Sequence, residues 1–235
     1  MELIGTPADL VLLDRIAVLE SVRVVDEARS GDWGRPTPCG RWTLRELVEH
    51  MAAQHHGFAA ASREEGADAS AWRTRDLGDD PAGAYRTAAT AVLDAFASPG
   101  LPERQFTLPE ITVRPVPAPR AVGFHFVDYV AHAWDVASAL GLAVRLPEPV
   151  LREALPIARA VPDGDVRRAP GAAFRPGLAL DEGIPSDRRG RPGTLPLVLA
   201  ALGRSPDWTP PPGPGAGPPP HTSPTVPNRA SPAGR

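Results

Sequence analysis

The chain has 235 residues, 42% of them hydrophobic, and a formal net charge of −3, so it is long and apolar enough to form one core. Its 25 basic and 28 acidic residues are interspersed, and it has neither a basic leader nor a run of about 18 apolar residues, so we expect a cytoplasmic protein that binds neither nucleic acid nor membrane. Its one cysteine, Cys39, excludes an internal disulfide and an all-cysteine zinc site, and a metal would therefore need histidine and carboxylate ligands.

Two helices are predicted in the first quarter of the chain. The first spans residues 7–29, because a proline at its first position precedes apolar side chains at helical spacing. Residues 30–41 are rich in glycine and proline and are expected to form a loop. The second helix spans residues 43–64, where Thr43 and Glu46 have the spacing of a capping box.

Two further helices flank a long connection. The third helix begins with Asp80 as N-cap and continues to about residue 98. The prolines of residues 101–119 prevent a helix there, and brief extended pieces are expected at 106–108 and 111–113. The fourth helix spans residues 119–141 and ends at a glycine C-cap.

The last part of the chain has weaker helical signals. Helices are expected at residues 148–160 and 194–202, with an extended stretch at 174–184 between them. Residues 209–235 are rich in proline and glycine and almost without large apolar side chains, which predicts a disordered tail. The prediction is therefore an all-α helical bundle with a few short extended segments and a Pro-rich tail.

The fourth helix carries the side chains with the most chemical potential. His125, Asp128, His132 and Asp135 follow one another at helical spacing, and Asp128 and His132 lie about 40° apart on one face. Such a pair can bind one metal ion if a facing helix completes the set. The second helix offers His50, His55 and His56 for that purpose. The alternative is that these polar residues only form hydrogen bonds inside a packed interface.

Three segments of the chain resemble one known family. PTPCGRWTLRELVEH (36–50), HFVDYVAHAWDVA (125–137) and LAALGRSPDW (199–208) are similar to the DinB-like bundle proteins related to mycothiol-dependent maleylpyruvate isomerase, in particular to an actinobacterial metal-binding branch. The resemblance implies a DinB-like up-down bundle over residues 7–208. That isomerase differs in having glutamate at the position of Asp128 and a further domain.

The resemblance also implies a ligand set and a chemistry. It assigns His50, Asp128 and His132 to a divalent metal, zinc in the first place and nickel, iron or manganese otherwise, with His125 or Asp135 moving a proton. The metal would activate a low-molecular-weight thiol such as mycothiol as cosubstrate for transfer or isomerisation of a small molecule. His50 lies roughly 110° from the middle of the apolar stripe on its helix, whereas His55 lies near its centre and is expected to pack in the core or orient a ligand.

Other roles remain open at the level of sequence. The same three ligands would serve a non-catalytic metal-binding or sensor module, or a metal-dependent hydrolase or cyclase with Asp135 as base. Cys39 could be a nucleophile, a fourth ligand or a small packed side chain, and Trp42 and Trp134 could line a pocket or the core. Arginines such as Arg41, Arg45 and Arg120 could hold a carboxylate. A homodimer is neither required nor excluded.

Overall fold

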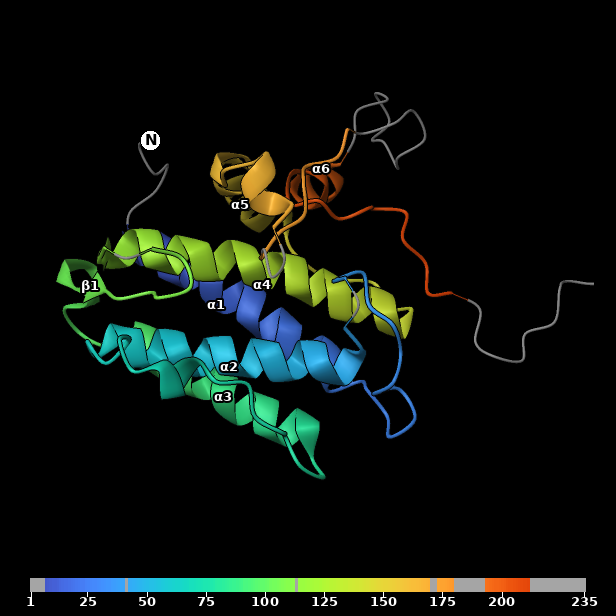
Figure 1. Ribbon diagram of the computed structural model, residues 1–235, viewed down its shortest axis with the longest axis horizontal. Helices are drawn as coiled ribbons and strands as arrows, with labels where there is room; N and C mark the ends of the chain where they lie inside the picture. The colour runs from blue at the N-terminus through green and yellow to red at the C-terminus, as the bar shows by residue number, and fades with distance from the viewer. Residues whose placement is uncertain (1–6, 41, 113, 170–172, 180–192, 212–235) are drawn as a thin grey trace, which may run out of the picture.

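Four long helices build the body of the protein. The computed structural model describes residues 7–40, 42–112, 114–169, 173–179 and 193–211. The bundle consists of α1 (Pro7–Val25), α2 (Leu44–Ser62), α3 (Pro81–Phe96) and α4 (Ala118–Leu140). Figure 1 shows α2 and α3 on one side and α1 and α4 on the other, which agrees with the contacts of α1 with α4 and of α2 with α3. The expected all-α bundle is confirmed.

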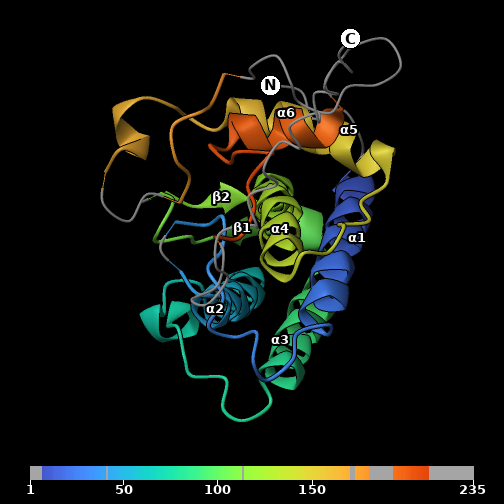
Figure 2. The same ribbon diagram turned by 90° about the vertical axis from the view of Figure 1, so that its right-hand side faces the viewer.

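Two shorter helices lie across the bundle. They are α5 (Glu148–Ala160) and α6 (Thr194–Ala201), which contact each other, while α5 also contacts α4. Figure 2 shows them side by side above α4, with their axes crossing that of α4. The segment that follows α6 is thereby brought against the bundle.

The remaining described elements are short. The 3-10 turns are Ala69–Trp72, Leu101–Glu103 and Asp165–Arg167. Strand β1 (Gln105–Phe106) pairs antiparallel with β2 (Val116–Pro117), with Phe106 opposite Val116. No helix in the described ranges has both the length and the apolar character needed to cross a membrane.

Local chemistry accounts for the helix ends. Thr43 and Glu46 form the predicted capping box, the Asp80 carboxylate accepts from the backbone N–H of Gly83, and Gly141 ends α4 with φ 70°. The first helix ends at Val25 and not at residue 29, because the backbone bonds beyond it change from i−4 to i−3 acceptors.

Other sequence-based expectations need revision or remain untested. The extended piece expected at 111–113 is wrong for Ile111 and Thr112, because both of their N–H groups bond to the Leu108 carbonyl and close a turn. Of the extended stretch expected at 174–184, residues up to 179 are described and form neither helix nor strand. Residues 212–235 of the expected disordered tail lie outside the described residues.

Candidate metal centre

α2 and α4 bring three possible ligands together. His50 lies on α2, Asp128 and His132 lie on successive turns of α4, and their donor atoms are all within 4.8 Å of one another. Nε2 of His132 is 3.3 Å from Oδ1 of Asp128. Two ligands of a tetrahedral ion with bonds of about 2.0–2.1 Å are about 3.3 Å apart, so this pair already has the spacing that a zinc ion requires.

The side chain of Asp135 fixes the ring of His132. Its Oδ2 lies 3.0 Å from Nδ1 of His132, and both side chains are buried. A ring that donates Nδ1–H to this carboxylate and binds a metal would use Nε2, which is directed toward Asp128, as its donor atom. Asp135 therefore lies behind His132, on the side away from the other two candidate ligands.

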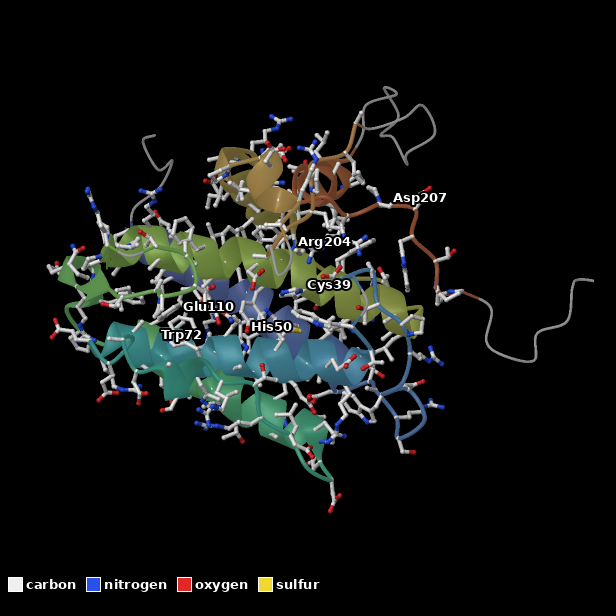
Figure 3. The ribbon with its side chains drawn as sticks, viewed as in Figure 1. Cys39, His50, Trp72, Glu110, Arg204 and Asp207 are labelled. Atoms are coloured by element: carbon white, nitrogen blue, oxygen red, sulfur yellow. The ribbon has the colours of Figure 1, made fainter. Side chains whose placement is uncertain are left out.

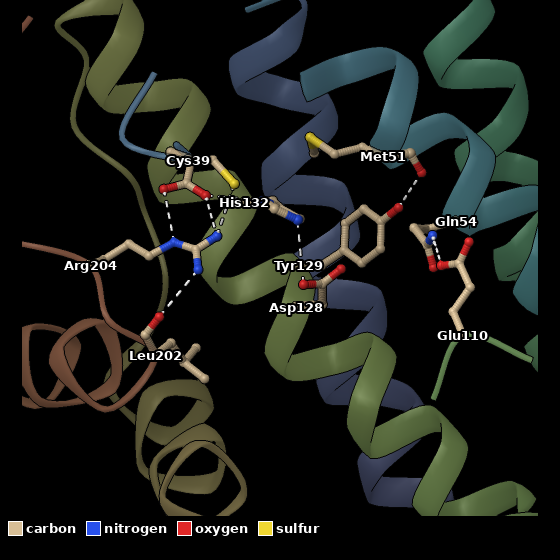
Figure 4. Close-up of polar contacts among 10 residues, drawn as sticks. Cys39, Met51, Gln54, Glu110, Asp128, Tyr129, His132, Leu202 and Arg204 are labelled. Atoms are coloured by element: carbon tan, nitrogen blue, oxygen red, sulfur yellow. Dashed lines mark hydrogen bonds and ion pairs between the residues drawn. The ribbon is translucent and has the colours of Figure 1, made fainter. Parts of the chain in front are cut away.

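A second group of donor atoms is already occupied by an internal cation. Cys39, His132 and Asp135 also lie within 4.8 Å of one another. Nη2 of Arg204 is, however, 3.1 Å from Asp135 Oδ2 and 3.2 Å from Cys39 Sγ (Figure 4). The guanidinium supplies the positive charge that a metal would supply there, so of the two groups only His50, Asp128 and His132 remain as candidate metal ligands.

Burial and the guanidinium of Arg204 act in opposite directions on the pKa values of Asp135 and Cys39. Burial alone would raise the pKa of Asp135, but Arg204 and His132 outweigh it, and the pKa lies below its usual value. Burial raises the pKa of the Cys39 thiol to about 12, although Arg204 opposes this. Cys39 is thus a protonated, packed thiol at neutral pH, which disfavours the nucleophile and ligand roles that the sequence left open.

The candidate ligands open onto a large cleft. It has a volume of about 1230 Å³ and lies between α2, α4, the connection before α4 and residues near Arg175 and Arg204. His50, Asp128, His132, Cys39 and Arg204 all line it. Figure 3 shows Cys39, His50 and Arg204 in the middle of the molecule, between the bundle and the α6 end. A cleft of this size holds a small molecule of cofactor dimensions.

The cleft wall beside the ligands is partly aromatic. Trp42 is 36% exposed, lines the cleft, and its ring lies 4.5 Å from that of His50. Trp134 is buried in the core instead. Burial lowers the pKa of His50 to about 4, with His132 acting in the same direction and Asp128 against it. The imidazole is therefore neutral, as a metal ligand must be.

The other sequence-predicted histidines lie elsewhere. His55 and His125 are fully buried, contact each other at 3.1 Å, and do not line the cleft. Nδ1 of His125 faces Asp14 at 2.6 Å. His56 is exposed on α2. The position of His125 thus gives no support to its expected role in moving a proton. Asp135, in contrast, is in contact with the candidate ligand His132.

Two features of the site were missed by sequence reasoning. Arg204 follows α6 and reaches Asp135 across 69 positions of the chain, which no local pattern signals. Gln54 of α2 donates to Glu110 at 3.1 Å, and both line the cleft (Figure 4). Of the arginines named from the sequence, Arg120 lines the cleft, Arg45 pairs with Glu49 and Asp76 at the surface, and Arg41 lies outside the described residues.

Comparisons with known proteins agree with this architecture. The model of the mycothiol maleylpyruvate isomerase N-terminal domain matches residues 15–137. Two uncharacterized proteins of Mycobacterium tuberculosis, from strains CDC 1551 and H37Rv, are each 33% identical over 149 residues, which cover 62% of this chain and 75% of theirs.

Solved structures show the same fold. The crystal structure of the mycothiol-dependent maleylpyruvate isomerase matches with a TM-score of 0.57 at 18% identity, over 86% of this chain and 91% of that one, and a variant of it with one histidine replaced by alanine matches with a TM-score of 0.58. The match spans nearly all of the isomerase chain and shows a shared fold, and the further domain expected in the isomerase stays a prediction.

Proposed function

Since the chain belongs to the family of the mycothiol maleylpyruvate isomerase N-terminal domain, we propose that it is a cytoplasmic enzyme that binds a divalent metal and uses a mycothiol-type thiol to transfer or isomerise a small electrophile. The observation that carries this proposal is the convergence of His50, Asp128 and His132 at one wall of a large cleft. Two histidines and one carboxylate leave positions open for a substrate, which is typical of a catalytic metal.

The donor set fits zinc, and nickel, iron or manganese are the alternatives that such ligands also accept. All three donor atoms come from side chains that face the same cleft, and one pair already has tetrahedral spacing. A bound divalent cation would lower the pKa of a thiol in its open position, so that the thiol can attack an electrophile at neutral pH.

Asp135 and Arg204 would orient the ligand histidine. Asp135 accepts from Nδ1–H of His132 and is held in turn by the guanidinium of Arg204. This places the proton on Nδ1 and keeps Nε2 free as the donor atom. We propose this role for Asp135 in place of proton transfer to substrate, because its carboxylate is fully buried and does not line the cleft.

Three arginines point to an anionic electrophile. Arg114, Arg120 and Arg175 line the cleft, and none of them forms an ion pair with a carboxylate of the described residues. An unpaired guanidinium beside a cleft is suited to a carboxylate or phosphate group of the substrate. We propose that these side chains bind the electrophile and that the thiol binds nearer the metal.

Metal content gives the first test of the proposal. Protein purified and loaded with Zn²⁺ should bind about one equivalent, and His50→Ala, Asp128→Ala and His132→Ala should each lose it, whereas His56→Ala, on the same helix but exposed, should retain it. Full zinc content in all three ligand variants would refute the assignment.

Turnover gives the second test. The zinc-loaded protein should form S-conjugates from mycothiol and carboxylated electrophiles, and His132→Ala should not. Tight metal binding without an S-conjugate from any of the electrophiles tested would instead indicate a non-catalytic metal-binding module. Hydrolysis of the electrophile without thiol would indicate that water is the nucleophile.

A further inference from the structure

A chain of buried polar side chains passes through all four helices of the bundle. It consists of Asp14 and Ser21 on α1, His55 on α2, Tyr85 on α3 and His125 on α4, and we refer to these five residues as the buried polar chain. All are at most 1% exposed. Its contacts are Asp14 Oδ1 to His125 Nδ1 at 2.6 Å, His125 Nε2 to His55 Nδ1 at 3.1 Å, His55 Nε2 to the Tyr85 hydroxyl at 3.3 Å, and that hydroxyl to Ser21 Oγ at 2.6 Å.

The direction of every hydrogen bond in the buried polar chain follows from Ser21, its last member. Ser21 has one hydroxyl proton and donates it to the Val18 carbonyl at 2.7 Å. Tyr85 must therefore donate to Ser21, and His55 must donate its Nε2–H to Tyr85. Nδ1 of His55 then has no proton and accepts from Nε2–H of His125.

This order leaves one proton between His125 and Asp14. The proton at the 2.6 Å contact belongs either to the Asp14 carboxyl group or to Nδ1 of His125, and the surroundings of the second carboxyl oxygen distinguish the two. Oδ2 of Asp14 is buried without a hydrogen-bond partner, which is far less costly for the carbonyl oxygen of a neutral acid than for a carboxylate. Burial also raises the pKa of Asp14, although His125 opposes it. We infer that Asp14 is a neutral acid in the folded protein.

The buried polar chain joins the two helices that carry the candidate metal ligands. Among the described residues, two hydrogen bonds link α2 to α4, from His125 to His55 and from the Tyr129 hydroxyl to the Met51 carbonyl. His55 is five residues from His50, and His125 is three residues from Asp128, which are distances of about 7.5 and 4.5 Å along the helices. Tyr129 also stacks on the His55 ring, with centroids 4.1 Å apart.

We propose that the buried polar chain positions α2 against α4, so that His50 meets Asp128 and His132 at the spacing required by one metal ion. This proposal rests on the proposed metal site. His55 and His125 are then positioning residues, which act on the ligands through the helices that carry them. The consequence is that breaking the buried polar chain weakens metal binding although every proposed ligand is still present.

Two substitutions interrupt the buried polar chain at different points. Tyr85→Phe keeps the ring but removes the hydroxyl between His55 and Ser21, and His55→Leu removes the hydrogen bond from His125, one of the two that link α2 to α4. The control is Ser62→Ala, which removes a buried hydroxyl of α2 that donates only to its own helix at Ala59. Zn²⁺ affinity and the visible spectrum of bound Co²⁺ are measured well below the melting temperature of each variant, so that lost stability alone does not affect them.

We expect His55→Leu to bind Zn²⁺ at least 10-fold more weakly and with an altered Co²⁺ spectrum, Tyr85→Phe to show a smaller effect in the same direction, and Ser62→Ala to match the wild type. Wild-type affinity and spectra in both chain variants, with only a lower melting temperature, would overturn the positioning role. A wild-type protein that binds no metal would instead refute the proposed function.

The proton assignment has its own readout, which needs no metal. Histidine ring 15N shifts should report His55 and His125 as neutral Nε2–H tautomers. Asp14→Asn, whose amide N–H can replace the carboxyl proton, should leave these shifts and the melting temperature near the wild type, whereas Asp14→Leu should not. A cationic His125, or an Asp14→Asn protein as disturbed as Asp14→Leu, would show that Asp14 is ionised. If His55→Leu does not fold, Tyr85→Phe and the 15N shifts still decide the matter.

Discussion

Nε2 of His132 lies 3.3 Å from Oδ1 of Asp128, one helical turn earlier on α4. A backbone in regular helical conformation places both side chains on one face of α4, so the arrangement of this candidate ligand pair depends on a single helix. The third candidate ligand, His50, comes from another helix, and the geometry of the proposed site therefore depends on how α2 and α4 are held together.

The charge of Asp128 should matter more than its length. Asp128→Asn keeps the shape of the side chain but removes the negative charge, and we expect Zn²⁺ affinity to fall by about 100-fold. Asp128→Glu keeps the charge and, because the side chain is partly exposed to the cleft, has room for one more methylene, so affinity should stay within about 10-fold. Isothermal titration with Zn²⁺ measures both, and equal affinities of the Asn variant and the wild type would contradict a ligand role.

Arg204 and Asp135 allow stability to be separated from metal binding. Arg204→Met leaves a buried carboxylate without its cation, and we expect the free energy of unfolding to fall by about 3–5 kcal/mol. The double variant Arg204→Met, Asp135→Leu removes both charges and should regain most of that stability in urea unfolding.

The same double variant should still bind Zn²⁺ about 10- to 100-fold more weakly, because Nδ1 of His132 has lost its acceptor. Recovery of metal affinity together with stability would show that Asp135 serves folding alone. The single variant Asp135→Leu is the matched control for the double variant. It also removes the acceptor of His132, but it leaves Arg204 buried without its carboxylate partner.

Sequence reasoning was most accurate where the determinants are local. The ends of α2, α3 and α4 follow from Thr43, Asp80 and Gly141, each of which acts on a backbone group within a few residues. The C-terminus of α1 and the turn at Ile111 were predicted less well, because the bonds that decide them depend on the packing of the loops.

The candidate site was harder to predict, for a physical reason. Helical periodicity reports which side chains are buried, and His55 at the centre of the stripe is indeed fully buried, in the buried polar chain. His50 lies at the edge of the stripe, where α2 borders the cleft, and only the family resemblance selected it. Arg204 depends on a contact between distant parts of the chain, which no single sequence pattern encodes.

Gly57 tests how closely the segment after α2 packs on that helix. A Cβ at this position would lie 2.2 Å from Cε3 of Trp72, which is buried, so Gly57→Ala should lower the free energy of unfolding by about 1–3 kcal/mol. Gly123→Ala on α4 is the control, because its Cβ would meet Ile157 and Leu10 at an ordinary 3.7 Å. That substitution should stabilise the protein by about 0.5–1 kcal/mol, and equal effects of the two changes in urea unfolding would contradict the packing.

His50 should make the metal-free protein sensitive to acid. Its pKa is lowered to about 4 by burial, with His132 adding to the effect, whereas a histidine in the unfolded chain has a pKa of about 6.5. Between these values the unfolded state binds a proton that the folded state does not, so the free energy of unfolding falls as the pH is lowered from about 6.5 to 4.

The contribution of His50 to this slope is at most about 1.4 kcal/mol per pH unit. His50→Gln removes the titrating group while the other acidic and imidazole groups still titrate in both proteins, so the difference between the two slopes isolates His50. Urea unfolding in the presence of a chelator at pH 7, 6, 5 and 4.5 should give a shallower decline for His50→Gln. Parallel declines would show that His50 titrates in the folded protein as it does in the unfolded chain, and hence that its ring is open to water and not enclosed between Trp42 and His132.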